Sequence, residues 1–284
     1  MGVKRRPRLP SARRPKPSPW NTGPTVLITG ASSGIGADLA LQFAARGYNL
    51  LLHGRDRGRL RALADKVRAQ HDVAVRIFVK DLSRPDSARE LFREVLRTNV
   101  RVDVLVNNAG IGLYGRFDRT PLDRETGMLH LNVLSLLELT KLFLPGMVER
   151  GAGRILNVAS TAAFQPGPLM AGYYATKAYV LSLSVALAEE LKGTGVSVSV
   201  LCPGPTPTRF QERAGLADVL AQKLALLSSE EVARITVEKL QQGKRLIVPG
   251  RLNKLGTILV RLVPLSLSAA VVKRLQERRV LHER

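Results

Sequence analysis

Seven short apolar runs alternate with longer helix-like segments from Pro24 onward, and this alternation constrains the fold more than any other feature of the chain. Continuous apolar strands separated by helices are typical of parallel strands that helices cover on both faces. The pattern therefore predicts an α/β fold, a doubly wound sheet of about seven parallel strands. The expected strands are Thr25–Thr29, Asn49–His53, Val73–Val79, Val102–Val106, Arg154–Val158, Val196–Leu201 and Arg245–Val248.

Charge divides the 284 residues into a body and two ends. Lys and Arg number 44 against 23 for Asp and Glu, a formal charge of +21, but residues 1–22 carry +7 of it and residues 243–284 carry +8. The remaining 220 residues, 23–242, carry only +6, so the body of the chain needs no polyanion partner and no specific nucleic acid is expected. The proline-rich residues 1–22 are predicted to be a disordered basic arm, and residues 251–284 a basic amphipathic helical extension.

Cysteine, histidine and hydropathy patterns exclude several protein classes. The single Cys202 excludes an intramolecular disulfide framework and fits a reducing compartment such as the cytoplasm. Four scattered histidines and one cysteine do not favour a metal site. No window of about 18 uncharged apolar residues occurs, so no spanning helix is expected, and the N-terminus has no apolar secretory signal.

A glycine-rich turn follows the first predicted strand directly. Gly30, Gly34 and Gly36 allow close approach to a pyrophosphate, and residues 37–46, which continue as a helix, offer free N–H groups at its start. This context predicts a dinucleotide site in a Rossmann-type fold, although the glycine spacing is not the commonest one. The alternative is a glycine turn needed only for packing of the helix on the strand.

The ends of the second and third strands bear on the choice of cofactor. An acid at the second strand end would select NAD by binding the ribose hydroxyls, but Arg55 comes first there and Asp56 follows. We therefore expect NADP(H) rather than NAD(H), with Arg55 meeting the 2′-phosphate, unless Arg55 is only a solvated side chain. Asp81, at the third strand end, is expected either to bind the adenine or to cap the next helix.

The ends of later strands carry side chains suited to acid–base chemistry. Tyr173 and Lys177 are four residues apart in a predicted helix, residues 172–192, so both side chains reach one ligand. A neighbouring ammonium is expected to lower the pKa of the phenol toward neutrality. Ser160, at the end of the fifth strand, can hold a substrate oxygen while the phenol exchanges its proton.

These motifs resemble those of the short-chain dehydrogenases/reductases of the single-domain type, over about residues 24–250. The resemblance rests on Thr-Gly-x-x-x-Gly-x-Gly at 29–36, Asn-Asn-Ala-Gly at 107–110, Asn132, Ser160, Tyr173, Lys177, and Pro203-Gly204 with Thr208. It implies that residues 23–250 are a dinucleotide-binding catalytic domain. Within the family, the run at 203–210 and the tail after Gly250 look most like bacterial oxidoreductases related to keto-acyl reductases.

The resemblance also implies roles for individual residues. Ser160 would polarise the carbonyl, Tyr173 would exchange the proton, and Lys177 would hold the nicotinamide ribose. Asn132 would hold a water that links Lys177 to solvent, unless it is a helix-interior amide that the backbone satisfies. The implied cofactor site comprises Tyr173 and Lys177 with Gly30, Ser32, Ser33, Gly34, Ile35, Gly36, Arg55, Asp81, Leu82, Asn108, Ala109, Gly110, Pro203, Gly204, Thr206 and Thr208.

The expected function is therefore transfer of a hydride between NADP(H) and a carbonyl or secondary alcohol. Residues 209–227 would form an aliphatic lid over an apolar substrate, with Tyr114, Phe164 and Met170 as pocket walls. The alternative is an NADP(H)-binding redox sensor, or a membrane-associated binding protein, without turnover. We expect a cytoplasmic homodimer or homotetramer, whose C-terminal extension either contacts an anionic membrane or covers the domain or a dimer interface.

Overall fold

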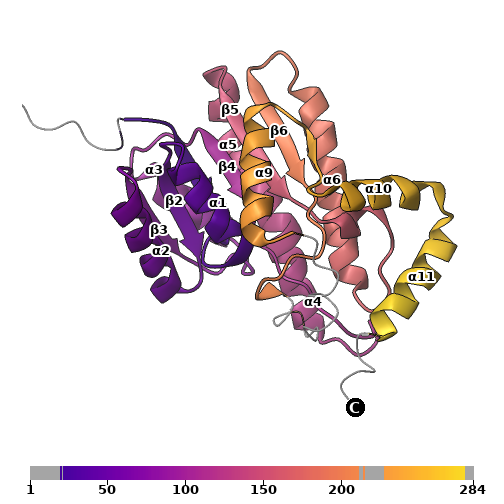
Figure 1. The fold of residues 1–284 in the computed structure, drawn as a ribbon. Coiled ribbons are helices and arrows are strands. Elements are labelled where there is room, and N and C mark those ends of the chain that lie inside the picture. The colour runs from indigo at the N-terminus through magenta and orange to yellow at the C-terminus, as the bar shows by residue number, and fades with distance from the viewer. Residues whose placement is uncertain (1–19, 21, 211–213, 215–226, 279–284) are drawn as a thin grey trace, which may run out of the picture.

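The computed structural model of this chain describes Trp20, residues 22–210, Ala214 and residues 227–278. Seven parallel strands form one sheet in the order β3-β2-β1-β4-β5-β6-β7, which confirms the predicted Rossmann-type architecture (Figure 1). Each strand falls on its predicted run, with ends that differ by at most two residues. The strands are β1 (Thr25–Ile28), β2 (Asn49–Gly54), β3 (Val75–Val79), β4 (Val104–Asn107), β5 (Gly153–Val158), β6 (Val196–Leu201) and β7 (Leu246–Ile247).

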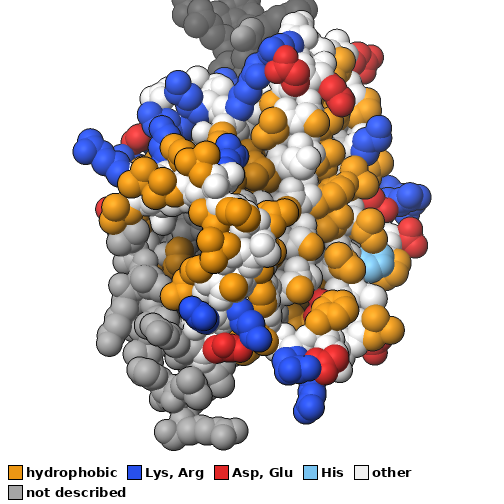
Figure 2. Space-filling model, turned by 90° about the vertical axis from the view of Figure 1, so that its right-hand side faces the viewer, with side chains coloured by type: hydrophobic (Ala, Val, Ile, Leu, Met, Phe, Trp, Pro, Cys, Tyr) orange, Lys and Arg blue, Asp and Glu red, His pale blue; other side chains and the backbone are white. Residues whose placement is uncertain are grey.

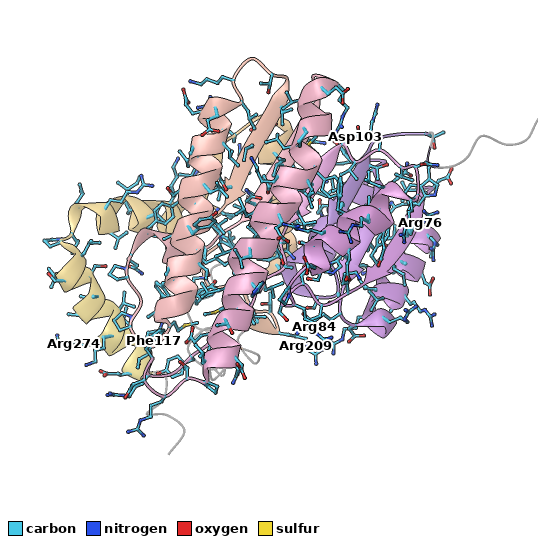
Figure 3. All side chains as sticks on the ribbon, turned by 180° about the vertical axis from the view of Figure 1, so that it is seen from behind. Arg76, Arg84, Asp103, Phe117, Arg209 and Arg274 are labelled. Atoms are coloured by element: carbon cyan, nitrogen blue, oxygen red, sulfur yellow. The ribbon has the colours of Figure 1, made fainter. Side chains whose placement is uncertain are left out.

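Helices cover both faces of this sheet. The helices are α1 (Gly34–Ala44), α2 (Arg57–Gln70), α3 (Ser87–Leu96), α4 (Leu122–Leu129), α5 (Ser135–Glu149), α6 (Ala171–Glu190), α9 (Ser229–Gln241), α10 (Arg251–Leu259) and α11 (Leu265–Arg278). A π-helix, η2 (His130–Leu134), joins α4 to α5, and 3₁₀ turns lie at η3 (Thr161–Phe164) and η4 (Val260–Leu262). Two large apolar clusters fill the layers, one beneath α1, α2 and α9 and the other mainly beneath α3 and α5 (Figures 1 and 3).

The strand order reverses between β1 and β4, and this reversal locates the site. β1 continues to β2 on one side and β4 continues to β5 on the other, so the connections leave in opposite directions. A crevice opens at such a point beyond the carboxyl ends of the strands. The glycine turn after β1 and the Asn-Asn-Ala-Gly segment after β4 both enter it.

The ends of the chain differ in how much of them the structure describes. Most of the predicted basic arm, and most of the predicted lid at 209–227, lie outside the described residues. Trp20 packs against the core and Arg76 lies 5.4 Å above its ring, while the Thr22 carbonyl accepts a hydrogen bond from Asn49. The body therefore begins slightly before residue 23. Residues 251–278 are helical, as α10, η4 and α11.

One helical stretch bears on the expectation that no segment could span a membrane. Leu122–Glu149, from α4 through η2 to α5, is long and apolar enough to do so by length and composition, with two charged residues in its most apolar part. However, 44% of that part is buried in the fold. Leu139, Phe143 and Met147 pack into the core under the sheet, as expected of a core helix in this fold. Its apolar character is therefore explained by packing.

His53, in β2, supplies a pH-dependent contribution to stability. Its side chain is buried and its Nε2 lies 3.1 Å from the Lys80 carbonyl oxygen. Burial lowers the pKa of His53 from 6.5 to about 4. The folded protein therefore keeps this ring neutral at pH values where the unfolded chain protonates it.

We expect the free energy of unfolding to fall as the pH drops from 6.5 to about 4, because the unfolded state binds the extra proton in that window. The contribution of His53 is roughly 3 kcal/mol. His53→Gln keeps a donor for the Lys80 carbonyl and should remove most of this dependence in urea unfolding measured across that range. An unchanged slope in the variant would contradict the assignment.

Candidate active site

The turn between β1 and α1 has space only for glycine at two positions. Gly30 has φ +68°, and a Cβ there would lie 2.8 Å from the Ala109 Cα. A Cβ on Gly36 would lie 2.4 Å from both the Gly30 carbonyl oxygen and Asn108 Nδ2. The glycines therefore let α1 and the segment after β4 approach closely, and they leave the turn open on the crevice side.

The N-terminus of α1 is prepared for an anion. Its N-cap, Ser33, makes no side-chain capping hydrogen bond, and the first turn contains no acidic residue. The first N–H groups of a helix have no intrahelical partner, and the helix dipole is positive there. These features fit the pyrophosphate of a dinucleotide.

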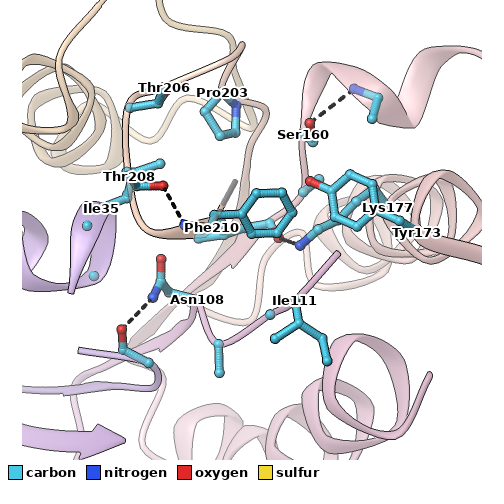
Figure 4. Close-up of a pocket in the computed structure, with 18 of the residues that line it drawn as sticks. Ile35, Asn108, Ile111, Ser160, Tyr173, Lys177, Pro203, Thr206, Thr208 and Phe210 are labelled. Atoms are coloured by element: carbon cyan, nitrogen blue, oxygen red, sulfur yellow. Dashed lines mark hydrogen bonds between the residues drawn. The ribbon is translucent and has the colours of Figure 1, made fainter. Parts of the chain in front are cut away.

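The Thr29 hydroxyl fixes the turn to the neighbouring strand. Its oxygen accepts hydrogen bonds from the backbone N–H groups of Asn108 and Ala109, both at 3.0 Å, and donates to the Val106 carbonyl. Asn108 Nδ2 returns hydrogen bonds to the carbonyls of Thr29 and Gly30 at 2.9 and 3.2 Å. Asn108, predicted to line the cofactor, therefore also holds the glycine turn (Figure 4).

The charged residues at the ends of β2 and β3 make different kinds of contact. Asp56 is the N-cap of α2, where it accepts from the Arg59 N–H and pairs with the Arg59 guanidinium. Arg55 remains half-exposed at the crevice and lies 3.7 Å from Asp81. The acid that follows Arg55 is thus engaged by its own helix, while the guanidinium faces the site.

Asp81 does not cap the following helix, which was one of its two predicted roles. The N-cap of α3 is Asp86, with φ +60°. Asp81 instead accepts hydrogen bonds from the N–H and hydroxyl of Ser83, because the chain makes a turn before the helix begins. Burial acts to raise the pKa of Asp81, but the Ser83 hydrogen bonds and the nearby arginines outweigh it, and the net shift is downward.

Ser160 lies at the end of β5, at the start of η3. Its hydroxyl accepts from the Ala162 N–H at 3.1 Å, so the side chain is held in one orientation. The next residue, Thr161, donates its N–H to the Pro203 carbonyl at 2.9 Å. This contact ties the end of β5 to the segment that follows β6.

Tyr173 and Lys177 lie in the first two turns of α6, and both side chains are buried. Lys177 Nζ is 5.9 Å from the centroid of the Tyr173 ring and donates to the Val158 carbonyl at 2.8 Å. Burial lowers the pKa of Lys177 from 10.5 to about 8. In Figure 4 the Tyr173 hydroxyl points toward Ser160, while the Lys177 ammonium is directed to its backbone acceptor.

The pKa of Tyr173 differs from the sequence expectation. Burial raises it above its usual value of 10.0, and interaction with the Ser160 side chain opposes that rise only in part. The expected lowering by Lys177 is not found, because its ammonium hydrogen-bonds the Val158 carbonyl and desolvation of the phenol dominates. The Tyr173 phenol is therefore protonated at neutral pH.

Asn132 lies in the π-helix η2, beneath the cavity. Its Oδ1 accepts from the Ile111 N–H at 3.0 Å, and its Nδ2 donates to the Ile111 carbonyl and the Thr176 hydroxyl. A Cβ on Gly110 would lie 3.2 Å from this Oδ1 and 3.4 Å from Lys177 Nζ. Asn132 therefore adjoins Lys177 across Gly110, and its amide is also satisfied by the backbone, as the alternative interpretation supposed.

The segment after β6 closes the crevice from the other side. The Thr206 hydroxyl donates to the Gly204 carbonyl at 3.1 Å. Thr208 lies opposite the glycine turn, since a Cβ on Gly34 would be 3.0 Å from its Cγ2. Cys202, just before this segment, is buried, and burial raises the pKa of its thiol to about 12.

A single cavity of about 470 Å³ brings the predicted site residues together. All 18 predicted cofactor residues line it, as do three of the four predicted catalytic residues. The fourth, Asn132, does not line the cavity but hydrogen-bonds the backbone of Ile111, which does. Among the described residues, no group of three His, Cys, Asp or Glu side chains is placed to hold a metal ion.

The walls around Tyr173 differ from those predicted. Met170 lines the cavity, but Tyr114 and Phe164 do not. Phe164 lies beneath Arg261, 4.7 Å from its guanidinium carbon, and the Tyr114 hydroxyl donates to the Gln276 carbonyl. The wall also contains residues that the sequence did not indicate, among them Ile111, Gln165, Tyr174, Val272, Leu275 and Gln276, and Phe210 of the predicted lid lines it too.

Gln276 joins the C-terminal extension to this wall. Its side chain is buried, and its Nε2 lies 3.2 Å from the Tyr174 hydroxyl and 3.7 Å from the sulfur of Met170. Gln276 is 102 positions from Tyr174 and 106 positions from Met170 in the sequence, and no sequence motif connects residues at such separations. Ser268, Val272 and Gln276 recur every four residues, as on one helix face, but this spacing alone does not indicate that the face is buried.

Comparison with known proteins agrees with this geometry. The short chain dehydrogenase family model matches residues 24–218. The ketoacyl reductase HetN of Nostoc sp. is 33% identical over 245 residues, which are 85% of this chain and 83% of that protein. A short-chain dehydrogenase from Sphingobium yanoikuyae, solved with NADPH, is 34% identical with a TM-score of 0.75, covering 85% of this chain and 96% of that one. A short chain dehydrogenase/reductase from Burkholderia phymatum, solved with NAD, is 26% identical with a TM-score of 0.76, covering 84% and 92%.

The chain belongs to the short-chain dehydrogenase family, as its motifs predicted. It is an oxidoreductase that uses a nicotinamide cofactor. The residues present fit that cofactor: the uncapped start of α1 suits the pyrophosphate, and the missing Cβ atoms of Gly30 and Gly36 give it a turn that side chains would fill. Arg55 and Asp81 would lie at the adenosine end, with Tyr173 and Lys177 at the nicotinamide end.

Proposed function

We propose that this enzyme is an NADP(H)-dependent reductase of apolar ketones or ketoacyl compounds, with Tyr173 as the acid–base residue. The observation that carries the proposal is the burial of Tyr173 beside Ser160 and Lys177 in the cavity that also contains the glycine turn. Chance does not readily bring these groups from two separate elements to one cavity. They supply an acid, an oxygen-binding hydroxyl and a cation where the substrate carbonyl would lie.

The bound nicotinamide supplies the hydride in reduction and accepts it in alcohol oxidation. The Ser160 hydroxyl donates a hydrogen bond to the carbonyl oxygen and so fixes its position. Tyr173 transfers its phenolic proton to that oxygen as negative charge develops on it. Ser160 is already oriented by the Ala162 N–H, so little ordering is required when substrate binds.

The protonation states support reduction at neutral pH. Burial raises the pKa of Tyr173, which keeps the phenol protonated and able to donate. Lys177, with its pKa lowered to about 8, is still largely cationic at neutral pH and stabilises the phenolate that remains after transfer. The ammonium of Lys177, beside Asn132, is then placed to return a proton to Tyr173.

The choice of NADP(H) follows from the end of β2. Arg55 is half-exposed at the crevice, and its partner Asp81 is 3.7 Å away and further engaged by Ser83. Asp56, which could otherwise bind the ribose hydroxyls, caps α2. A 2′-phosphate therefore meets a guanidinium there and no competing carboxylate from β2.

The substrate end of the cavity is mainly apolar. Met170 and Phe210 stand beside Tyr173, with the Phe210 ring centroid 5.2 Å from that of Tyr173. Ile111, Val272 and Leu275 extend the apolar wall. Such a wall gains free energy by excluding water from an aliphatic or bulky substrate body.

Tyr173→Phe should abolish most ketone reduction. The phenylalanine keeps the ring packing but has no proton to give, so kcat should fall roughly 10²–10⁴-fold in an assay of NADPH oxidation over a panel of aliphatic and bulky ketones. Tyr179→Phe is the matched control, because Tyr179 lies on the same helix and is exposed to solvent. Reduction by Tyr173→Phe at the wild-type rate would refute the mechanism, and cofactor binding without turnover by the wild type would favour the binding-protein alternative.

Arg55→Ala should weaken NADPH binding selectively. Loss of a charged hydrogen bond to the 2′-phosphate should raise the Kd for NADPH about tenfold to a hundredfold and leave the Kd for NADH nearly unchanged. Fluorescence titration of both cofactors measures the two constants. If the wild type binds NADH more tightly than NADPH, and the substitution changes neither value, the cofactor assignment is wrong.

A further inference from the structure

The C-terminal helical unit, defined as α10, η4 and α11 (Arg251–Arg278), exposes many apolar side chains. Among the described residues, 18 large apolar side chains are exposed, and nine of them lie between Leu252 and Leu275. Soluble surfaces expose single apolar side chains routinely, but a concentration in one segment marks a contact surface. The unit is therefore a docking surface that needs a partner.

The orientation of α10 is inverted relative to an ordinary surface helix. Thr257 is buried and Asn253 is half-buried against the body, with Asn253 Nδ2 donating to the Pro249 carbonyl. Leu252, Leu255 and Leu259 project from the other side, with exposed fractions of 65%, 51% and 52%. The polar side of α10 thus faces the protein and its apolar side faces outward.

Helix α11 presents an exposed apolar stripe next to its buried one. Ser268 and Gln276 are buried at the ends of the stripe that faces the body. Leu267, Val271 and Leu275 recur at a spacing of four residues and are each about half exposed. Apolar side chains of α10 and α11 therefore cover one side of the C-terminal helical unit, as Figure 2 shows for this face of the molecule.

The same unit is cationic. Its exposed basic side chains are Arg251, Lys254, Arg261, Lys273 and Arg274, and its one acid, Glu277, lies 3.7 Å from Lys273. Arg274 projects from α11 at the end of the molecule opposite Arg76 (Figure 3). Basic side chains bordering an apolar surface complement a layer that is anionic outside and apolar within.

We propose that the C-terminal helical unit docks on the surface of an anionic lipid bilayer. The outward leucines of α10 and the stripe of α11 enter the interfacial region, while Lys254, Arg261 and Arg274 contact lipid phosphates. A helix with these features lies in the membrane plane and does not span it. The enzyme then works at the cytoplasmic face of a membrane, where anionic lipids are concentrated.

A second copy of the chain fits this surface less well. A two-fold dimer places the same patch against itself, so the basic side chains of each copy would meet those of the other. The unit carries six Lys or Arg residues against one Glu, a net charge of +5, which makes that contact repulsive. A homodimer or homotetramer through another surface remains a prediction from the family resemblance.

The docking surface adjoins the entrance of the active-site cavity. Val272, Leu275 and Gln276 of α11 line the cavity, and Leu275 also belongs to the exposed stripe. An apolar substrate dissolved in the bilayer would therefore reach Tyr173 without crossing water. This route rests on the proposed function, whereas the docking itself does not.

Cosedimentation of the full chain with sucrose-loaded vesicles tests the docking. The protein should sediment with vesicles of phosphatidylcholine and phosphatidylglycerol, should bind vesicles of phosphatidylcholine alone at least about tenfold more weakly, and should lose affinity at high salt. Absence of binding to the mixed vesicles would overturn the proposal.

Two variants separate the electrostatic and apolar contributions. Lys254→Glu/Arg274→Glu should weaken binding to the mixed vesicles at least about tenfold, since each cation near the surface contributes roughly a fivefold affinity. Arg61→Glu/Lys66→Glu makes the same charge change on α2, whose side chains Arg61 and Lys66 are exposed at the other end of the sheet, and should bind as the wild type does. Equal loss in both variants would show only a general charge effect and would contradict a specific surface.

Leu255→Ser/Leu259→Ser should also weaken vesicle binding, with Leu96→Ser, an equally exposed leucine on α3, as the control. Sedimentation of the lipid-free proteins gives the decisive comparison. If the wild type is a dimer that Leu255→Ser/Leu259→Ser dissociates, a second copy covers this face and the proposal is wrong. Vesicle binding without ketone turnover would instead refute the proposed function and leave the docking intact.

Discussion

The Thr29 hydroxyl joins the ends of β1 and β4, and the placement of the whole site depends on that connection. It accepts hydrogen bonds from two backbone N–H groups after β4, and the Asn108 side chain donates a hydrogen bond to the Thr29 carbonyl in the turn after β1. A backbone donor that loses its partner away from water costs up to about 1–3 kcal/mol, so separating these groups would destabilise the turn. Because the glycine turn and the Asn-Asn-Ala-Gly segment are held together here, both line one cavity, where a bound dinucleotide would contact them.

Burial then sets the protonation states of Tyr173 and Lys177. Tyr173 and Lys177 are both removed from water, and each is shifted toward its neutral form. A neutral phenol can donate a proton, which is what the proposed reduction requires of Tyr173. The hydroxyl of Ser160 and the amide of Asn132 are fixed by backbone contacts, which leaves few rotatable groups at the reacting centre.

Much of the fold and part of the site could be predicted from local patterns. The seven apolar runs specified the strands, because parallel strands covered on both faces must be apolar throughout. Tyr173 and Lys177 were recognisable because a spacing of four residues in a helix places them together. Thr29 was recognised only as part of the motif, since its hydrogen bonds to Asn108 and Ala109 span 79 and 80 residues.

Other features could not be read from sequence because they depend on tertiary packing. Gln276 reaches Tyr174 and Met170 only through the path of the C-terminal chain after β7. The raised pKa of Tyr173 depends on the extent of its burial, and the inverted orientation of α10 depends on which side meets the body. Aliphatic content alone did not distinguish a buried helix face from an exposed one.

In the proposed reaction, a hydride passes from the nicotinamide to the carbon of an apolar carbonyl while Tyr173 protonates its oxygen. The most direct measurement is mass spectrometry of the alcohol formed from an aliphatic ketone and NADPH that carries deuterium at nicotinamide C4 on the transferred face. The account predicts one deuterium bound to the carbinol carbon of the product. Product that contains no deuterium, from either labelled face of the nicotinamide, would contradict it.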